Sequence, residues 1–163
     1  LEGRKKMDER QSLCNMVDHL DLKTSTIILA DRGYESFNVY EHINKSGYNY
    51  VIRGKDIKSN GFLSHLELPQ SSTFDVTVEL KLTRRQTKEI KSDKSYRFLS
   101  STAKFDYLEK DSKDYYPIKL RVVRLEVEKG IYECLLTNLD ANWFPPSELK
   151  TLYHLRWGIG VSR

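Results

Sequence analysis

The chain has 163 residues, 39% hydrophobic and 31% charged, with a formal net charge of +4. This composition predicts a soluble, folded chain with one sizeable core, and it excludes a disordered protein. Two distant cysteines, Cys14 and Cys134, form neither a disulfide framework nor a zinc pattern, which fits a reducing cytoplasm. No apolar run approaches the ~20 residues of a membrane span, so we expect no membrane partner. The mild positive charge is compatible with a nucleic-acid partner without requiring one.

The first part of the chain alternates helical and strand patterns. Helical spacing of apolar residues predicts a helix from about residue 8 to residue 20, and the apolar run 27–30 predicts a buried strand. Ser36 is a suitable cap for a second helix that ends near Lys45, and residues 48–53 are rich in aromatic and β-branched residues, which predicts a second strand. This order predicts an α/β arrangement with parallel neighbouring strands.

Asp31 follows the first predicted strand directly, and Gly33 allows a sharp reversal after it. Open α/β sheets bind their ligands at the carboxyl ends of parallel strands. A carboxylate at that point is a natural ligand for Mg²⁺. The alternative is that Asp31 only caps the following turn, as short polar side chains often do.

Strand patterns dominate after Gly54. Strict alternation of apolar and polar residues over 74–82 predicts a half-buried antiparallel strand, and residues 96–99 form a weaker candidate. A longer strand is predicted over 115–127, followed by a turn and a returning hairpin arm over 131–137. We therefore expect an antiparallel β region here.

A basic run lies inside this β region. Its members are Lys81, Arg84, Arg85, Lys88, Lys91, Lys94 and Arg97. If these side chains share one face, they would neutralise several phosphates and bind DNA in a salt-dependent manner. The alternative is a solvated loop, which is the commonest role of such runs.

The last predicted element is a helix that begins at Pro145-Pro146. Leu149, Leu152, Tyr153 and Arg156 fall on one side of it. By itself this pattern indicates an amphipathic helix whose aromatic residues only pack.

Two stretches resemble the DDE transposases of insertion sequences, of the group-four type. Residues 30–34 are similar to the region around the family's second catalytic aspartate, and residues 152–159 are similar to its C-terminal signature. That signature is Tyr, two residues, Arg, three residues, Glu, six residues and Lys. It matches Tyr153 and Arg156, and the resemblance implies that both lie near the DNA backbone at the active site.

The resemblance implies a partial ribonuclease-H-like α/β core over 1–54, a β-rich insertion over 55–140 and a helix over 141–163 that returns to the core. It implies that Asp31 is catalytic and binds Mg²⁺ or Mn²⁺ during cleavage and strand transfer of DNA. It also implies transposon ends and target DNA as partners, and a dimer on DNA.

The chain departs from the signature where the family has its catalytic Glu, because that position is Gly160. The family's first Asp would precede Leu1. We therefore expect a fragment of a longer protein that is inactive as an isolated chain and binds no metal tightly. Two alternatives stay open: a non-catalytic DNA-binding or interaction module from a decayed element, and an unrelated α/β nuclease piece that uses Asp31 and Glu35.

Overall fold

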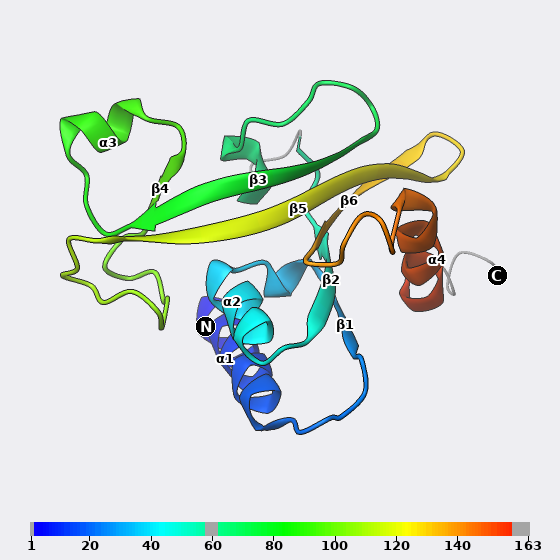
Figure 1. Cartoon of the computed structure of the whole chain (residues 1–163), viewed down its shortest axis with the longest axis horizontal. Coiled ribbons are helices and arrows are strands. Elements are labelled where there is room, and N and C mark those ends of the chain that lie inside the picture. The colour runs from blue at the N-terminus through cyan, green and yellow to red at the C-terminus, as the bar shows by residue number, and fades with distance from the viewer. Residues whose placement is uncertain (1, 58–61, 158–163) are drawn as a thin grey trace. The chain divides into compact units, whose positions relative to one another are not determined.

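The computed structural model describes residues 2–57 and 62–157 (Figure 1). The chain forms two compact units. Unit 1 consists of residues 1–76 and 121–163, and unit 2 consists of residues 77–120. The helices are α1 (Glu2–His19), α2 (Phe37–Lys45), α3 (Lys88–Ser92) and α4 (Pro146–Arg156), with 3₁₀ turns η1 (Arg32–Tyr34) and η2 (Phe62–His65). None of the helices in the described part of the chain has the length and apolar composition that a membrane span requires.

Six strands form one mixed sheet. The strands are β1 (Ile27–Ala30), β2 (Asn49–Gly54), β3 (Phe74–Thr83), β4 (Tyr96–Phe98), β5 (Tyr115–Glu128) and β6 (Ile131–Thr137). The strand order is β1-β2-β6-β5-β3-β4. The predicted mixture of α/β elements and further strands is confirmed at this level, and the strands and the helices α2 and α4 fall close to their predicted ranges, whereas α3 was not predicted. The largest shift is α1, which begins at Glu2 rather than near residue 8.

In the α/β part of unit 1, helices and strands follow one another in the order that the sequence predicts. Strands β1 and β2 are parallel, with Ala30 opposite Ile52. Between them, α2 begins where the Ser36 hydroxyl accepts hydrogen bonds from two backbone amides, and it ends before Gly47, whose φ of +79° suits glycine. Strand β1 is less buried than predicted, because it lies at the edge of the sheet and only Ala30 is fully covered.

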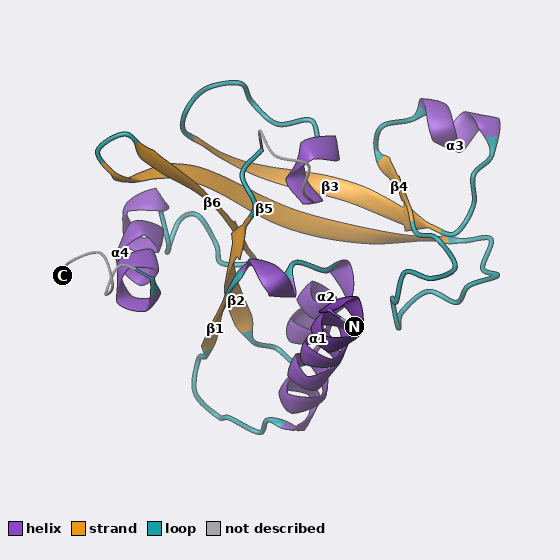
Figure 2. Cartoon of the chain, turned by 180° about the vertical axis from the view of Figure 1, so that it is seen from behind, coloured by secondary structure: helices purple, strands orange, loops and turns teal. Residues whose placement is uncertain are grey.

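Alternation along β2 gives unit 1 two apolar layers. Tyr50 points toward α2 and stacks on Tyr40 with ring centroids 5.1 Å apart. Val51 faces the opposite way, into a cluster that includes Leu149 and Tyr153 of α4. Helices α1 and α2 lie side by side (Figure 2). The odd-numbered side chains of β2 therefore face α4, and the even-numbered ones face α2.

The hairpin of β5 and β6 returns the chain to β2. The turn between them uses Gly130 at φ +77°, as the sequence predicts, and β6 then pairs antiparallel with β2. This pairing places β6 in unit 1, whereas the sequence analysis assigned residues 131–137 to the predicted insertion over 55–140. The boundaries of the compact units thus differ from the predicted ranges, and the assignment of 55–140 to a family insertion stays a prediction.

Two arginines on β5 attach the 55–76 segment to the sheet. Arg121 is 5% exposed and binds both carboxylate oxygens of Asp75, at 2.8 and 2.7 Å. Arg124 pairs with Asp56 at 3.0 Å and donates to the Ser72 carbonyl oxygen at 2.7 Å. Each buried cation is therefore compensated within unit 1, as burial of charge requires.

Unit 2 contains most of β3, all of β4 and the first residues of β5. Strand β4 runs parallel to β3, with Lys81 opposite Tyr96, so the prediction of purely antiparallel pairing is wrong here. The reason is the short helix α3, capped by Thr87, which carries the chain back to the start of β4.

The side chain of Asn138 continues the β2–β6 pairing beyond the end of β6. Its Oδ1 accepts from the Tyr50 amide at 2.8 Å, and its Nδ2 donates to the Tyr48 carbonyl at 3.0 Å. A second Nδ2 bond at 2.8 Å reaches Asn44 at the end of α2. One side chain thus satisfies backbone groups of β2 and links that strand to α2.

We predict that Asn138→Leu lowers the free energy of unfolding by about 2 kcal/mol, because the Tyr50 amide and the Tyr48 carbonyl lose their partners. Urea unfolding followed by circular dichroism measures this change. The exposed Asn142 supplies the control, Asn142→Leu, for which the expected change is under about 0.5 kcal/mol. Equal midpoints for the two variants would show that Asn138 does not hold β2.

Candidate functional site

Asp31 stands at the carboxyl end of β1, next to a cation from β2. Because Ala30 lies opposite Ile52, the residues that follow them, Asp31 and Arg53, are neighbours on the α4 side of the sheet. Arg53 Nη2 donates to Asp31 Oδ1 at 2.8 Å. Asp31 precedes η1 but makes no side-chain capping bond, so the simpler interpretation of Asp31 as a turn cap is wrong.

Helix α4 and the residue that follows it, Trp157, supply two aromatic rings to this point. The Arg53 guanidinium lies over the Trp157 ring, 5.4 Å from its centroid, in cation–π geometry. Tyr153 is buried, and its hydroxyl donates to Glu133 Oε1 at 3.4 Å. Burial, and then the negative charge of Glu133, raise the pKa of the Tyr153 hydroxyl, while Arg53 opposes this shift.

Glu133 is a site residue that the sequence did not single out, and the same is true of Arg53, Arg32 and Trp157. Glu133 comes from β6, and Arg32 Nη2 binds its Oε2 at 2.9 Å. Its side chain is 13% exposed, whereas that of Arg32 is 46% exposed. The only available signal was a charged residue in an otherwise apolar hairpin arm. Two carboxylates and two guanidinium groups thus form two ion pairs, Asp31–Arg53 and Glu133–Arg32.

Glu35 lies on the other side of η1, close to the end of β2. Its Oε1 accepts from the Lys55 amide at 3.1 Å, and its buried Oε2 has no partner among the described residues. Burial raises the pKa of the Glu35 carboxyl, against the smaller lowering effects of the Lys55 amide and the Arg32 charge. Gly54 is packed closely beside Glu35. A Cβ on Gly54 would lie 2.7 Å from Leu136 Cδ1 and 3.5 Å from Glu35 Oε2, so a larger residue would not fit without a shift of Leu136.

A family model described as the transposase DDE domain matches residues 4–159. The chain belongs to the DDE transposase family. No curated protein and no solved structure matches the chain significantly. The family indicates a transposition-related function with DNA as substrate, and its members generally use a divalent metal ion.

The described residues do not by themselves fit a complete metal centre of the DDE domain. No three side chains of His, Cys, Asp or Glu gather closely enough within residues 2–57 and 62–157. Asp31 has one oxygen bound by Arg53, and the two-metal mechanism needs several carboxylates to hold its ions. Gly160 lies outside the described residues. The role of Asp31 as a metal ligand therefore stays a prediction.

The predicted DNA contacts of the DDE domain lie in different environments. Tyr153 is buried, and Arg156 is exposed, with its guanidinium 5.9 Å from the Trp157 ring centroid. In unit 2, Arg85 and Lys88 are exposed. Arg156, Arg85 and Lys88 are thus exposed and Tyr153 is not, and the contact of all four with DNA stays a prediction.

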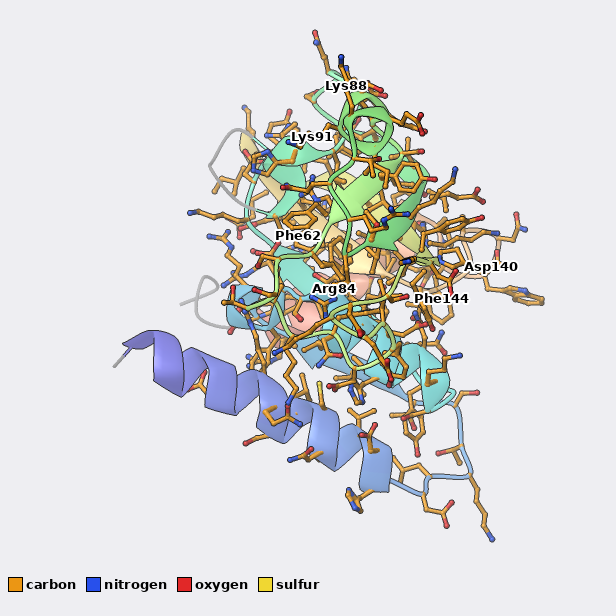
Figure 3. The ribbon with its side chains drawn as sticks, turned by 90° about the vertical axis from the view of Figure 1, so that its left-hand side faces the viewer. Phe62, Arg84, Lys88, Lys91, Asp140 and Phe144 are labelled. Carbon is orange, nitrogen blue, oxygen red and sulfur yellow. The ribbon has the colours of Figure 1, made fainter. Side chains whose placement is uncertain are left out.

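Arg84 has a different environment from its neighbours in the basic run. Its guanidinium donates to the Ser100 and Ala103 carbonyl oxygens at 2.7 and 2.8 Å, with longer bonds to Phe105 and Leu108. Figure 3 shows Lys88 projecting outward, whereas Arg84 lies among neighbouring side chains. Arg84 therefore holds the loop before β5, and its contact with DNA stays a prediction.

We predict that Glu35→Gln increases stability more at pH 7 than at pH 4. The raised pKa of Glu35 means that the folded state disfavours its ionised carboxylate. The protein therefore loses stability as pH rises from the pKa that Glu35 has in the unfolded chain through its higher pKa in the folded protein. Glutamine keeps an acceptor for the Lys55 amide and does not titrate. The expected gain at pH 7 is under about 1 kcal/mol because solvent screens the site.

Urea midpoints of both proteins across this pH range measure the difference, with the exposed Glu9→Gln as control. A difference that is constant with pH would contradict the raised pKa of Glu35.

Proposed function

We propose that this chain is the part of a DDE transposase of the insertion-sequence group-four type that carries the second catalytic aspartate, Asp31. The observation that carries the proposal is the position of Asp31 at the carboxyl end of a parallel strand, within a chain that matches the DDE domain over 4–159. The sequence similarity at residues 30–34 and 152–159 supports the finer assignment. The reaction is DNA cleavage and strand transfer.

Asp31 contributes one carboxylate to the catalytic centre, and the other carboxylates come from outside the described residues. Mg²⁺ or Mn²⁺ is the cofactor that suits carboxylate oxygens and phosphate. Arg53 holds the Asp31 carboxylate in place and compensates its charge while the centre is incomplete. Tyr153 of α4 and Trp157 directly after it orient Arg53, which couples the C-terminal signature to Asp31.

The chain as given is inactive in this proposal. One carboxylate that is paired with an arginine cannot hold two metal ions, and glycine at position 160 supplies no ligand. The same two observations favour the second candidate function, a non-catalytic DNA-binding or interaction module that derives from a decayed element.

A cleavage assay on duplex DNA with terminal repeats separates the two candidates. The present chain and its Gly160→Glu variant are expected to leave the duplex intact. A longer protein is expected to cleave when it carries Gly160→Glu, an added strand that ends in Asp and the remainder of the signature helix. In that protein Asp31→Ala should abolish cleavage, whereas the exposed Asp21→Ala should not.

Cleavage by the present chain would mean that its catalytic carboxylates lie elsewhere, and Glu35 would be the first to replace. Cleavage by the longer protein that survives Asp31→Ala would remove Asp31 from the site.

Duplex binding by the exposed part of the basic run is a separate test. We predict that Arg85→Ala with Lys88→Ala weakens binding to duplex DNA and reduces the slope of log affinity against log salt by about two. Fluorescence anisotropy at several salt concentrations measures this slope. Arg84 is left intact because its bonds to backbone carbonyls hold a loop. An unchanged slope would leave Arg85 and Lys88 as solvated surface.

A further inference from the structure

The strongest feature outside the Asp31 site is one face of the three-stranded part of unit 2. Strand β4 places Tyr96 and Phe98 on the same face, because alternate residues of a strand point the same way. Tyr96 lies opposite Lys81 of β3, and its ring meets that of Tyr115 edge to face, with centroids 6.1 Å apart. Large apolar rings remain open to solvent here: Tyr115 is 51% exposed and Phe98 is 41% exposed.

A cation lies between the two tyrosine rings. The Lys81 Nζ is 4.9 Å from the Tyr96 ring centroid and 5.4 Å from that of Tyr115. Both distances are within the range of cation–π attraction. Asp93 also faces Lys81, but the Asp93 carboxylate accepts hydrogen bonds from the Ser95 hydroxyl and amide at 2.7 and 2.9 Å.

The same face is hollowed. A pocket of about 520 Å³ is lined by the polar residues Glu79, Lys81, Ser95, Tyr115 and Lys119, together with apolar residues of β3 and β5. This volume lies in the ~300–1,000 Å³ range of small-ligand sites. Lys119 contacts Glu79 at 3.5 Å, but both side chains are about three-quarters exposed, so that ion pair is weak.

Charge is concentrated in the same unit. Residues 77–120 contain eleven Lys and Arg against seven Asp and Glu, a net charge of +4. The whole chain also has a net charge of +4, so unit 1 is neutral overall. Exposed rings beside ammonium groups, in a positive unit, complement a ligand that alternates flat apolar faces with anionic groups.

We propose that this face binds single-stranded nucleic acid, with a base stacked on the Tyr115 ring and the adjacent phosphates beside Lys81 and Lys119. Stacking on aromatic side chains combined with a cationic groove is the general basis of single-strand binding. A duplex does not fit this description, because its bases are already stacked on one another. The proposal goes beyond transposition, since it requires neither Asp31 nor the exposed cations Arg85 and Lys88.

Fluorescence anisotropy of the whole chain with a labelled twelve-residue oligothymidylate tests the proposal. The single strand should bind at least about tenfold more tightly than an abasic oligomer of equal length, because one stacked base contributes a factor of this size. An oligouridylate of the same length distinguishes RNA from DNA as the source of the ligand. Equal affinity for the abasic oligomer would overturn the proposal, because phosphates alone would then explain binding.

Variants of the face separate stacking from charge. Tyr115→Leu should weaken single-strand binding about tenfold, and Tyr115→Phe should retain it, since the ring is what stacks. Lys81→Met should reduce the salt slope by about 0.7, the value for one phosphate of a single strand. Trp143→Ala removes an aromatic ring that is 79% exposed elsewhere, and it should have no effect.

Urea unfolding of each variant verifies that the fold is intact. If Tyr115→Leu proves unstable, Lys81→Met and the abasic oligomer still decide the question. Wild-type affinity in folded Tyr115→Leu would overturn the proposal and would leave the DNA cleavage assay unaffected.

Discussion

The structure of unit 1 depends on strand β2, which pairs with β1 on one side and with β6 on the other. Its parallel partner β1 fixes Asp31 beside Arg53, and its antiparallel partner β6 brings the hairpin and Glu133 to the same sheet. Alternation along β2 then sends Arg53 toward α4 and Tyr50 toward α2. Because a shift of one residue in either register would exchange these faces, the site and the core share one set of hydrogen bonds.

Charge compensation explains the state of the candidate site. Arg53 and Arg32 each bind a carboxylate from a neighbouring element, so the two acids and two bases together carry no net charge. Opposite charges attract within each pair, whereas unpaired carboxylates gathered in the same place would repel one another. A metal centre reverses this balance, because it needs several carboxylates around cations that the protein does not supply.

The two units differ in their electrostatics. Unit 1 is neutral as a whole and buries Arg121 and Arg124 against Asp75 and Asp56, which makes these two arginines part of the core. Unit 2 carries the net charge of the chain. Within unit 2, Arg84 shows why a run of basic residues is not uniform: its guanidinium satisfies backbone carbonyls, while its neighbour Arg85 is exposed.

Local chemistry in the sequence determined the elements themselves. Ser36 and Gly47 mark the ends of α2, Gly130 marks the hairpin, and the apolar run before Asp31 marks β1, because each depends on residues close along the chain. Only the tertiary structure decided that Arg53 meets Asp31 and that Arg32 meets Glu133, 101 residues away. Those contacts depend on strand order and register, which arise when distant segments bury their apolar faces together, and no local pattern encodes them.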